Sequence, residues 1–476
     1  MIVSVNHQQI NNKEGITMQA QKKLSLKKMG IMVLMTNFLT GFCLTMNQNY
    51  GAYAYTDLAR ITPAMMATCM TVVNTIALII SLVSGALLTS TRSRFGKFRP
   101  WILGANAVIM LGGYMLFFNA SDNMMVKAIV ISIGYLLGNS MMDFVGAAKP
   151  ALNSNIAGAD SQARDVLMSR QWIGANACAV VSGLVVVPLV QFFGKTDERT
   201  GFLVVQTIFT IMVMIGSIWM FKSTAPYDPD NRSEAKQQGE RTSLLEMVRA
   251  VVTNRLALTV VISDIVRFTG FYVLFSMMVY QCTAVIGDMM AMTYVLSTSA
   301  IFAILGNIIA PLVSSRMGGR KKTVSIFGLL TGLSFASIGI FGKTTWGFTI
   351  SCSLAYFFMS FIDTLDTMLY MDAGEYWLHK TGKDTRPYLL SMYNVAVKAA
   401  MALSSVALGL ILTAINYQPG VILKGAAAST LTWATGLGPG LGYLLPVVIM
   451  MLHNVSDKEM KAIIAANAEK YSGADN

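Results

Sequence analysis

Long runs of apolar residues separated by short polar segments dominate the pattern along this chain of 476 residues. A helix needs about 20 predominantly apolar residues to cross the hydrocarbon core of a bilayer. Twelve such runs occur, near residues 29–55, 63–88, 101–119, 127–152, 169–193, 201–222, 255–281, 290–313, 323–342, 346–371, 386–416 and 430–452. The pattern predicts an all-α polytopic membrane protein with twelve transmembrane helices.

The longest segment without such a run is polar and divides the predicted spans six and six. We therefore expect two six-helix bundles joined by a central loop. The predicted order is a cytoplasmic N-terminal segment, a first bundle, the loop, a second bundle and a C-terminal tail, at residues 1–28, 29–222, 223–254, 255–453 and 454–476.

Lysine and arginine gather in segments that the alternating spans place on one side of the membrane. These basic segments are residues 22–28, 92–99, 316–322 and 458–470, whereas few basic residues occur in the opposite connections, 56–62, 120–126 and 417–428. Because cytoplasmic loops are enriched in Lys and Arg, we expect both termini to be cytoplasmic in a multi-pass protein of the bacterial cell membrane. These loops account for the net charge of +12 without a nucleic-acid partner.

Two of the basic segments form a repeat. Residues 91–97 (TRSRFGK) follow the second predicted span of the first half, and residues 315–322 (SRMGGRKK) follow the second span of the second half. Parallel repeats are typical of transporters whose substrate site lies between the halves, near the bilayer midplane.

Composition excludes several classes of protein. Charged residues make up 13% of the chain, whereas soluble domains contain about 25%. The five cysteines include no CxxC pair, and the three histidines lie outside the apolar centres, so we expect no metal site and no cofactor. Without a catalytic dyad or an extramembrane domain, we expect a protein that is not an enzyme.

Four motifs, in order along the chain, carry a family resemblance: Tyr55–Asp57, Arg92–Trp101, Gly374–Tyr376 and Val397–Lys398. With them the chain resembles the glycoside–pentoside–hexuronide:cation symporters of the major facilitator superfamily, the group of melibiose, lactose and glucuronide permeases. The resemblance implies two pseudo-symmetric six-helix bundles that rock around a central site, a glycoside substrate, a coupling cation and a monomeric transporter. It places Gly374–Tyr376 between the tenth and eleventh spans.

The chain departs from this family in its first two spans. The resemblance places the family's paired cation-binding carboxylates at Ala77 and Ser81, and an arginine that precedes them at Asn74. Residues 63–88 contain no Asp or Glu, which argues against the family's usual sodium coupling and favours a proton. The sugar-binding acid of the first span falls at Gly41.

Ionisable residues within spans are candidates for function, because a charge at the bilayer centre costs about 2.5–3.5 kcal/mol on insertion scales. Asp143 and Arg170 match substrate-binding positions of the resembled family, and Lys398 matches its coupling lysine. An alternative for Asp143 and Arg170 is a buried ion pair between the fourth and fifth spans. For Lys149 we expect a place at the cytoplasmic interface, with its ammonium among the headgroups.

The tenth span carries two acids on one face, Asp363 and Asp366. Carboxyl groups this close can share one proton, so they are candidates to replace the missing pair of the second span in coupling. The alternative is that they pair with Lys398 or with a basic residue near the cytoplasm. Asp264 and Arg267 of the seventh span are also three apart and are expected to neutralise each other.

Candidate substrate ligands also include amide, phenol and indole side chains. Asn47 and Tyr50 of the first span suit hydrogen bonding to hydroxylated ligands, and Trp172, near Arg170, suits stacking on a sugar ring. All three suit contacts between helices as well.

The loop after the second span is a candidate conformational latch. We expect Arg92, Arg94 and Lys97 to pair with acids at helix ends, such as Asp160 or Asp165, in one state of the transport cycle.

These features predict a secondary active transporter that imports a glycoside or related sugar derivative by alternating access, with H+ favoured over Na+. Two alternatives stay open. One is a uniporter or exchanger of the same fold, and the other is a symporter for an anionic or amphipathic ligand such as a glucuronide or a non-sugar aglycone.

Overall fold

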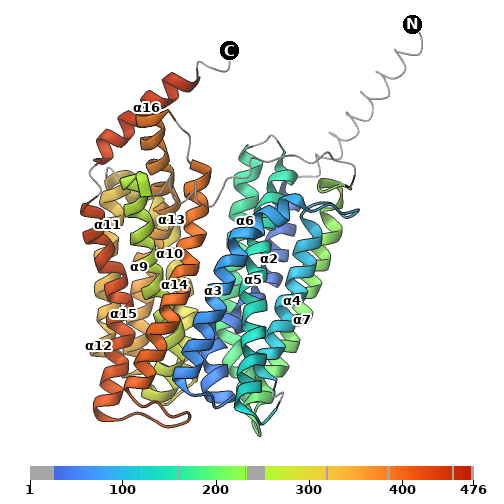
Figure 1. The fold of residues 1–476 in the computed structure, drawn as a ribbon, viewed down its shortest axis with the longest axis vertical. Helices are drawn as coiled ribbons and strands as arrows, with labels where there is room; N and C mark the ends of the chain where they lie inside the picture. The colour runs from blue at the N-terminus through green and yellow to red at the C-terminus, as the bar shows by residue number, and fades with distance from the viewer. Residues whose placement is uncertain are drawn as a thin grey trace.

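The computed structural model describes residues 26–118, 121–158, 161–230, 232, 252–317, 320–382, 386–452 and 455–472 (Figure 1). Within these ranges the chain is almost entirely helical, and twelve helices are long and apolar enough to cross a membrane. The all-α fold and the twelve predicted spans are therefore confirmed.

The first six spans form one bundle. Its helices are α2 (Leu26–Tyr53) with the π-helical turn η1 (Ala54–Leu58), α3 (Pro63–Ser90), α4 (Arg99–Phe117), α5 (Met124–Ala157), α6 (Ser161–Phe193) and α7 (Glu198–Ser223), followed by the 3-10 turn η2 (Ala225–Tyr227). Polar residues of the predicted turns begin these helices. Asn123 and Asp197, for example, accept the first backbone N–H groups of α5 and α7.

The second six spans form the other bundle. Its helices are α9 (Arg255–Tyr280) with the π-helical turn η3 (Gln281–Ile286), α10 (Met290–Met317), α11 (Arg320–Ala336) with α12 (Ile338–Phe341), α13 (Thr345–Thr381), α14 (Arg386–Ala414) and α15 (Gly425–Met451), followed by α16 (Asp457–Ser472). The first helix of each bundle ends in a π-helical turn, as expected of two repeats.

Some helical structure lies outside the expected spans. The helix α13 continues to Thr381, so Gly374–Tyr376, which lies between the tenth and eleventh spans as expected, is part of a helix that extends beyond the tenth span. The predicted C-terminal tail contains α16, which packs against α13. Most of the predicted N-terminal segment and central loop lies outside the described residues.

The two bundles touch along two related seams, α3 against α14 and α6 against α10. Both seams depend on a glycine. A Cβ added to Gly183 of α6 would lie 2.9 Å from Ser297 Oγ of α10, and one added to Gly409 of α14 would collide with Ala67 of α3. Helix backbones can approach this closely in membranes only where side chains are small.

These seams are closed at one end and open at the other. We call the end where α2 begins the termini side, and the end that carries η1 and η3 the far side. The bundles meet at the far side and diverge toward the termini side (Figure 1). About three helical turns from Gly183 and Ser297 toward the termini side, on the same helix faces, Trp172 is 63% exposed and Ile308 is 66% exposed.

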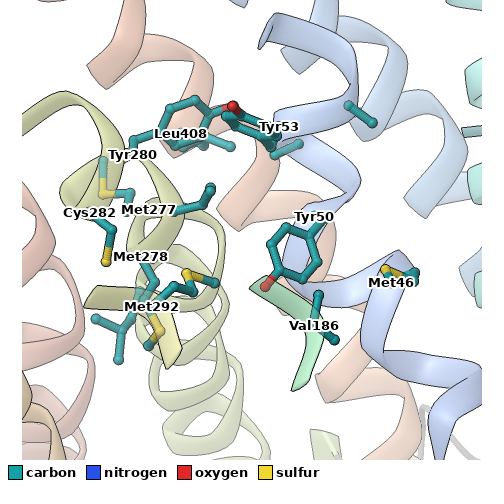
Figure 2. Packing of buried hydrophobic residues seen from close by; sticks show 14 of the residues in the cluster. Met46, Tyr50, Tyr53, Val186, Met277, Met278, Tyr280, Cys282, Met292 and Leu408 are labelled. Carbon is teal, nitrogen blue, oxygen red and sulfur yellow. The ribbon is translucent and has the colours of Figure 1, made fainter. Parts of the chain in front are cut away.

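Hydrogen bonds between the bundles hold the far side closed. The hydroxyls of Thr56 and Tyr280 lie 2.8 Å apart, and Tyr417 donates to Asp57 Oδ1 at 2.9 Å. Burial and then the Asp57 carboxylate raise the pKa of Tyr417, which therefore remains a donor. Near these bonds, Tyr50 of α2 faces α9 across an apolar core that includes Met277 and Met278 (Figure 2), whereas the Tyr53 hydroxyl donates to Glu198 of α7.

The basic loop of the first bundle is anchored to that same bundle. The carboxylate of Asp228, just after η2, accepts the backbone N–H groups of Lys97, Phe98 and Arg99 at 2.8, 2.8 and 2.9 Å. The Arg99 guanidinium donates to the Asp228 carbonyl at 2.9 Å. This cluster, the Asp228 clasp, fastens the start of α4 to the end of α7.

The Asp228 clasp includes Lys97, one of the three basic residues expected to act as a conformational latch. Of the acids expected to pair with it, Asp160 and the side chain of Asp165 lie outside the described part, while the side chains of Arg92 and Arg94 are exposed. Lys97 is held through its backbone, within one bundle. The role of the three basic residues as a latch between states stays a prediction.

The Asp228 clasp predicts an asymmetry between two neighbouring aspartates. Asp228→Ala leaves three backbone N–H donors without their acceptor and removes the carboxylate that lies 3.9 Å from Nε of the buried Arg99 guanidinium, so we expect a loss of about 3–5 kcal/mol and a clearly lower Tm. Asp230 forms an exposed pair with Arg232, and Asp230→Ala should change little. The Tm of each purified variant is measured by heating samples and using size-exclusion chromatography to quantify the protein that stays folded. Equal Tm values for the two variants would contradict the clasp.

Candidate functional site

An ion pair joins the two bundles near the centre of the membrane. Lys398 Nζ of α14 lies 3.1 Å from Asp143 Oδ1 of α5 and also donates to the Asn139 carbonyl at 3.1 Å. Lys398 is twelve residues after the start of α14, about 18 Å along the helix axis. Both side chains are mostly buried, at 9% and 18% exposure, so each charge neutralises the other.

The alternative in which Asp143 pairs with Arg170 was wrong. Arg170 lies beside the first turn of α2, where a Cβ on Gly30 would be 3.5 Å from its Cγ, and it is exposed on the termini side. Asp143 still has acceptor capacity, because its Oδ2 atom is buried without a hydrogen-bond partner among the described residues. Direct substrate contacts by Asp143, Arg170 and the exposed Trp172 stay predictions.

A chain of buried amides runs beside this pair. Asn47 of α2 donates to Asn139 of α5 at 3.5 Å, and Asn139 donates to Asn74 of α3 at 3.3 Å. Asn74 in turn donates to Ser405 Oγ of α14 at 2.9 Å and to the Met401 carbonyl at 3.2 Å. Sequence reasoning missed Asn139 and Ser405, although buried amides in apolar spans are a usable signal because they need partners.

Asn47 and Tyr50 combine packing with unused polar atoms. The Tyr50 ring packs on Phe202 with a centroid distance of 5.2 Å, and the side chain is fully buried. Its hydroxyl and the Asn47 Oδ1 atom have no partner among the residues described. Both side chains therefore serve contacts between helices in this arrangement, and their role as substrate ligands stays a prediction.

A second charged cluster lies within the other bundle, centred on Arg267 of α9. The guanidinium contacts Asp363 Oδ1 at 2.7 Å, Asp264 Oδ1 at 3.4 Å, and Asp366. Tyr370 donates to Asp264 at 2.7 Å. The expected contact of Asp264 with Arg267 is confirmed, but two further acids share that cation, and the alternative in which Asp363 and Asp366 pair with Lys398 was wrong.

This acid cluster has more carboxyl groups than cations. Asp264 and Asp366 are almost completely buried, whereas the Asp363 side chain is 44% exposed. Arg267 is twelve residues after the start of α9, as Lys398 is in α14, so both cations lie at similar depth. With one guanidinium facing three carboxyl groups, the site can take up a proton.

Lys149 does not lie at the interface as expected. Its ammonium donates to Thr40 Oγ1 of α2 at 2.7 Å, and Thr40 is 2% exposed. Lys149 therefore extends from α5 into the first bundle, where the sequence predicted an ammonium among lipid headgroups.

Gly41 has a packing reason to lack a side chain. A Cβ there would lie 2.8 Å from both Cβ and Sγ of Cys178, because α2 and α6 cross closely at this point. A carboxylic side chain does not fit at this contact, so the first bundle cannot bind a sugar through an acid at Gly41.

No group of His, Cys, Asp and Glu side chains in the described part of the chain is arranged to hold a metal ion. The site is built from ion pairs, amides and phenols. Groups of this chemistry can bind a polar solute and exchange protons.

Comparison with known proteins agrees with this architecture. Residues 30–457 match the family described as MFS/sugar transport protein. The chain therefore belongs to this family of transporters, and the resemblance to the glycoside–pentoside–hexuronide:cation symporters is confirmed. The protein is a multi-pass membrane transporter and not an enzyme.

Individual relatives cover nearly the whole chain. An uncharacterized symporter of Bacillus subtilis, YjmB, is 24% identical over 94% of this chain and 96% of the relative. An isoprimeverose transporter of Lactiplantibacillus pentosus is 22% identical over 93% and 91%. A crystal structure of the nucleoside transporter NupG matches with a TM-score of 0.58 at 15% identity, over 90% of this chain and all of that one, which shows the shared fold.

The ion pair between the bundles predicts strong energetic coupling. Lys398→Met and Asp143→Asn each leave one buried charge without its partner. Each should therefore lower the free energy of unfolding by about 3–5 kcal/mol, and with it the Tm. The double variant should recover a large part of that loss, which a double-mutant cycle on purified protein measures. Arg170→Met combined with Asp143→Asn provides the contrast, and its effects should simply add. Additive effects for the Lys398 and Asp143 pair would contradict the geometry.

Proposed function

We propose that this protein imports a glycoside or related sugar derivative by alternating access, coupled to a proton. The observation that carries the proposal is the Lys398–Asp143 pair, which joins the bundles at the depth where transporters of this fold bind substrate. The match to a sugar transport family and to a relative named as an isoprimeverose transporter supports the substrate class. We infer that one chain suffices, because the bundles of a single chain form the whole site.

Asp143 connects substrate binding to the contact between bundles. Sugar hydroxyls can donate to the free Oδ2 atom of Asp143, and a ligand bound to this carboxylate weakens its ion pair with Lys398. Substrate would therefore loosen one bond between α5 and α14 while the amide chain from Asn47 to Ser405 remains. In this way occupancy of the site changes the balance between the two bundle arrangements.

The acid cluster is the proposed proton site. In the arrangement open to the termini side, Asp363 is the most exposed of the three acids. The single guanidinium of Arg267 contacts all three carboxyl groups and cannot neutralise three negative charges. Closing that opening would bury the excess charge, which is costly in a membrane. A proton on Asp363 removes the cost, so bundle movement and protonation become linked.

The orientation follows from the basic loops. Four Lys- and Arg-rich segments lie on the termini side of the sequence-derived topology. We therefore infer that the termini side faces the cytoplasm of a bacterial cell, and that the structure is the inward-open arrangement, from which substrate leaves during import.

A facilitator of the same fold is the second candidate. The absence of Asp and Glu from residues 63–88 favours it, because the family's cation-binding pair would lie there. A facilitator equilibrates its substrate and never accumulates it, so energised transport separates the two candidates.

Uptake of a panel of labelled methyl glycosides into proteoliposomes with an imposed proton gradient tests the proposal. We expect accumulation that depends on the proton gradient and is indifferent to sodium. Lys398→Met and Asp363→Asn should each reduce accumulation by about tenfold or more, because each removes a step that links binding to movement. Asp363→Asn should retain counterflow of substrate, since the Asp143 site is intact.

Asp122→Asn, an exposed change in the connection between α4 and α5, is the control and should leave uptake unchanged. Equilibration without accumulation in the unmodified protein would favour the facilitator. Full accumulation by both the Lys398 and the Asp363 variants would overturn the proposed coupling.

A further inference from the structure

We propose that Lys149 is a subsite for an anionic group of the substrate, a carboxylate or a sulfonate. This inference rests on the proposed function and narrows it to acidic sugar derivatives. The first bundle would bind the acidic group through Lys149 and the hydroxyl groups through Asp143, six residues earlier on α5.

The charge of Lys149 lacks a counter-charge in the described part of the protein. Its ammonium donates to Thr40 Oγ1 at 2.7 Å, and no described Asp or Glu forms an ion pair with it. Its titratable neighbours are the thiols of Cys43 and Cys178. Lys398 and Arg267, two other cations within the spans, both contact carboxylates, whereas the partner of Lys149 among the described residues is a hydroxyl.

Open space lies beside Gly146, one turn before Lys149 on α5. Gly146 is three residues before Lys149, and a Cβ added to it would meet nothing within 4 Å. Gly146 and Ala147 are both exposed. They follow Asp143 by about one turn, on the side where the bundles diverge, so small side chains line the stretch from Asp143 to Lys149.

The spacing suits one sugar unit with an acidic substituent. Six residues of helix separate Asp143 from Lys149, which is about 9 Å along the axis. A sugar ring whose hydroxyl groups bind Asp143 can therefore direct a carboxylate or sulfonate substituent of the same ring toward Lys149. The ammonium would exchange its single hydroxyl partner for an anion, which is a much stronger bond in a site of low dielectric.

A second cation lies nearer the opening. Arg170 is exposed and lies beside Gly30, ten residues or about 15 Å along α2 from Thr40. Lys149 and Arg170 thus contact α2 at two different depths. Together they give the first bundle a positive potential on the termini side of the Lys398–Asp143 pair. Such a potential favours anions over neutral sugars.

The test compares two ligands that differ only in the acidic group, methyl β-D-glucuronide and methyl β-D-glucoside. Binding of each to the purified protein in nanodiscs, and uptake of each into proteoliposomes, are measured for the unmodified protein and for Lys149→Met, Lys149→Arg and Lys127→Met. Lys127 is the matched control, since it lies on α5 near the far side.

We expect the unmodified protein to bind the glucuronide about tenfold or more tightly than the glucoside. Lys149→Met should abolish that preference while changing glucoside binding by no more than about twofold, and Lys149→Arg should keep most of it. Lys127→Met should behave as the unmodified protein does. The preference of the unmodified protein for the glucuronide tests the inference without any variant. The inference can therefore be refuted even if a Lys149 variant fails to fold.

Two failures are distinguishable. Gradient-driven uptake of the glucoside without a preference for the glucuronide, or a preference that survives Lys149→Met, would overturn the anion subsite and leave the proposed function standing. Transport of neither compound would overturn the proposed function and the subsite together.

Discussion

A cation inside a bilayer needs a counter-charge, and in this protein the need is met across the contact between two moving bodies. Lys398 belongs to one six-helix bundle and Asp143 to the other. Separating them at the midplane would leave two charges in a medium that solvates neither well. The bundles can therefore move apart at this depth only when a solute, water or a proton takes the place of the lost partner, which makes the pair a natural control point for transport.

The charges that remain within each bundle have opposite signs in excess. In the second, three carboxyl groups surround Arg267, and the acids are in excess. In the first, Lys149 has a threonine hydroxyl where a carboxylate would be expected, and the cation is in excess. One half is thus suited to take up a proton and the other to take up an anion, and the Lys398–Asp143 pair lies between them. The resembled family binds its coupling cation through two carboxylates of the second span. In this chain that span is α3, which contains no Asp or Glu, so the coupling site must lie elsewhere.

Close packing gives the bundles the rigidity that such a mechanism requires. The Asp228 clasp fastens α4 to α7 within the first bundle, and glycines let α6 meet α10 and α14 meet α3 at the far side. The hydroxyl contacts of Thr56 with Tyr280 and of Asp57 with Tyr417 complete the closure. Because each bundle is internally tied, the seams are where movement is least costly, and the diverging end exposes Trp172 and Ile308.

The spans, their number and the family could be predicted from the sequence, because the length of an apolar run and the cost of charge in lipid act locally along the chain. The sequence also showed which ionisable residues lie within the membrane, including Asp143, Lys398 and Asp363. How these residues pair became visible only in the three-dimensional arrangement of the helices. The partner of Lys398 comes from a helix more than 250 residues earlier in the chain, the acid that holds the basic loop is Asp228, and Lys149 turns inward to Thr40. Which charges meet depends on helix rotation and crossing, and glycines such as Gly41 set these through close contacts between helices distant in the sequence.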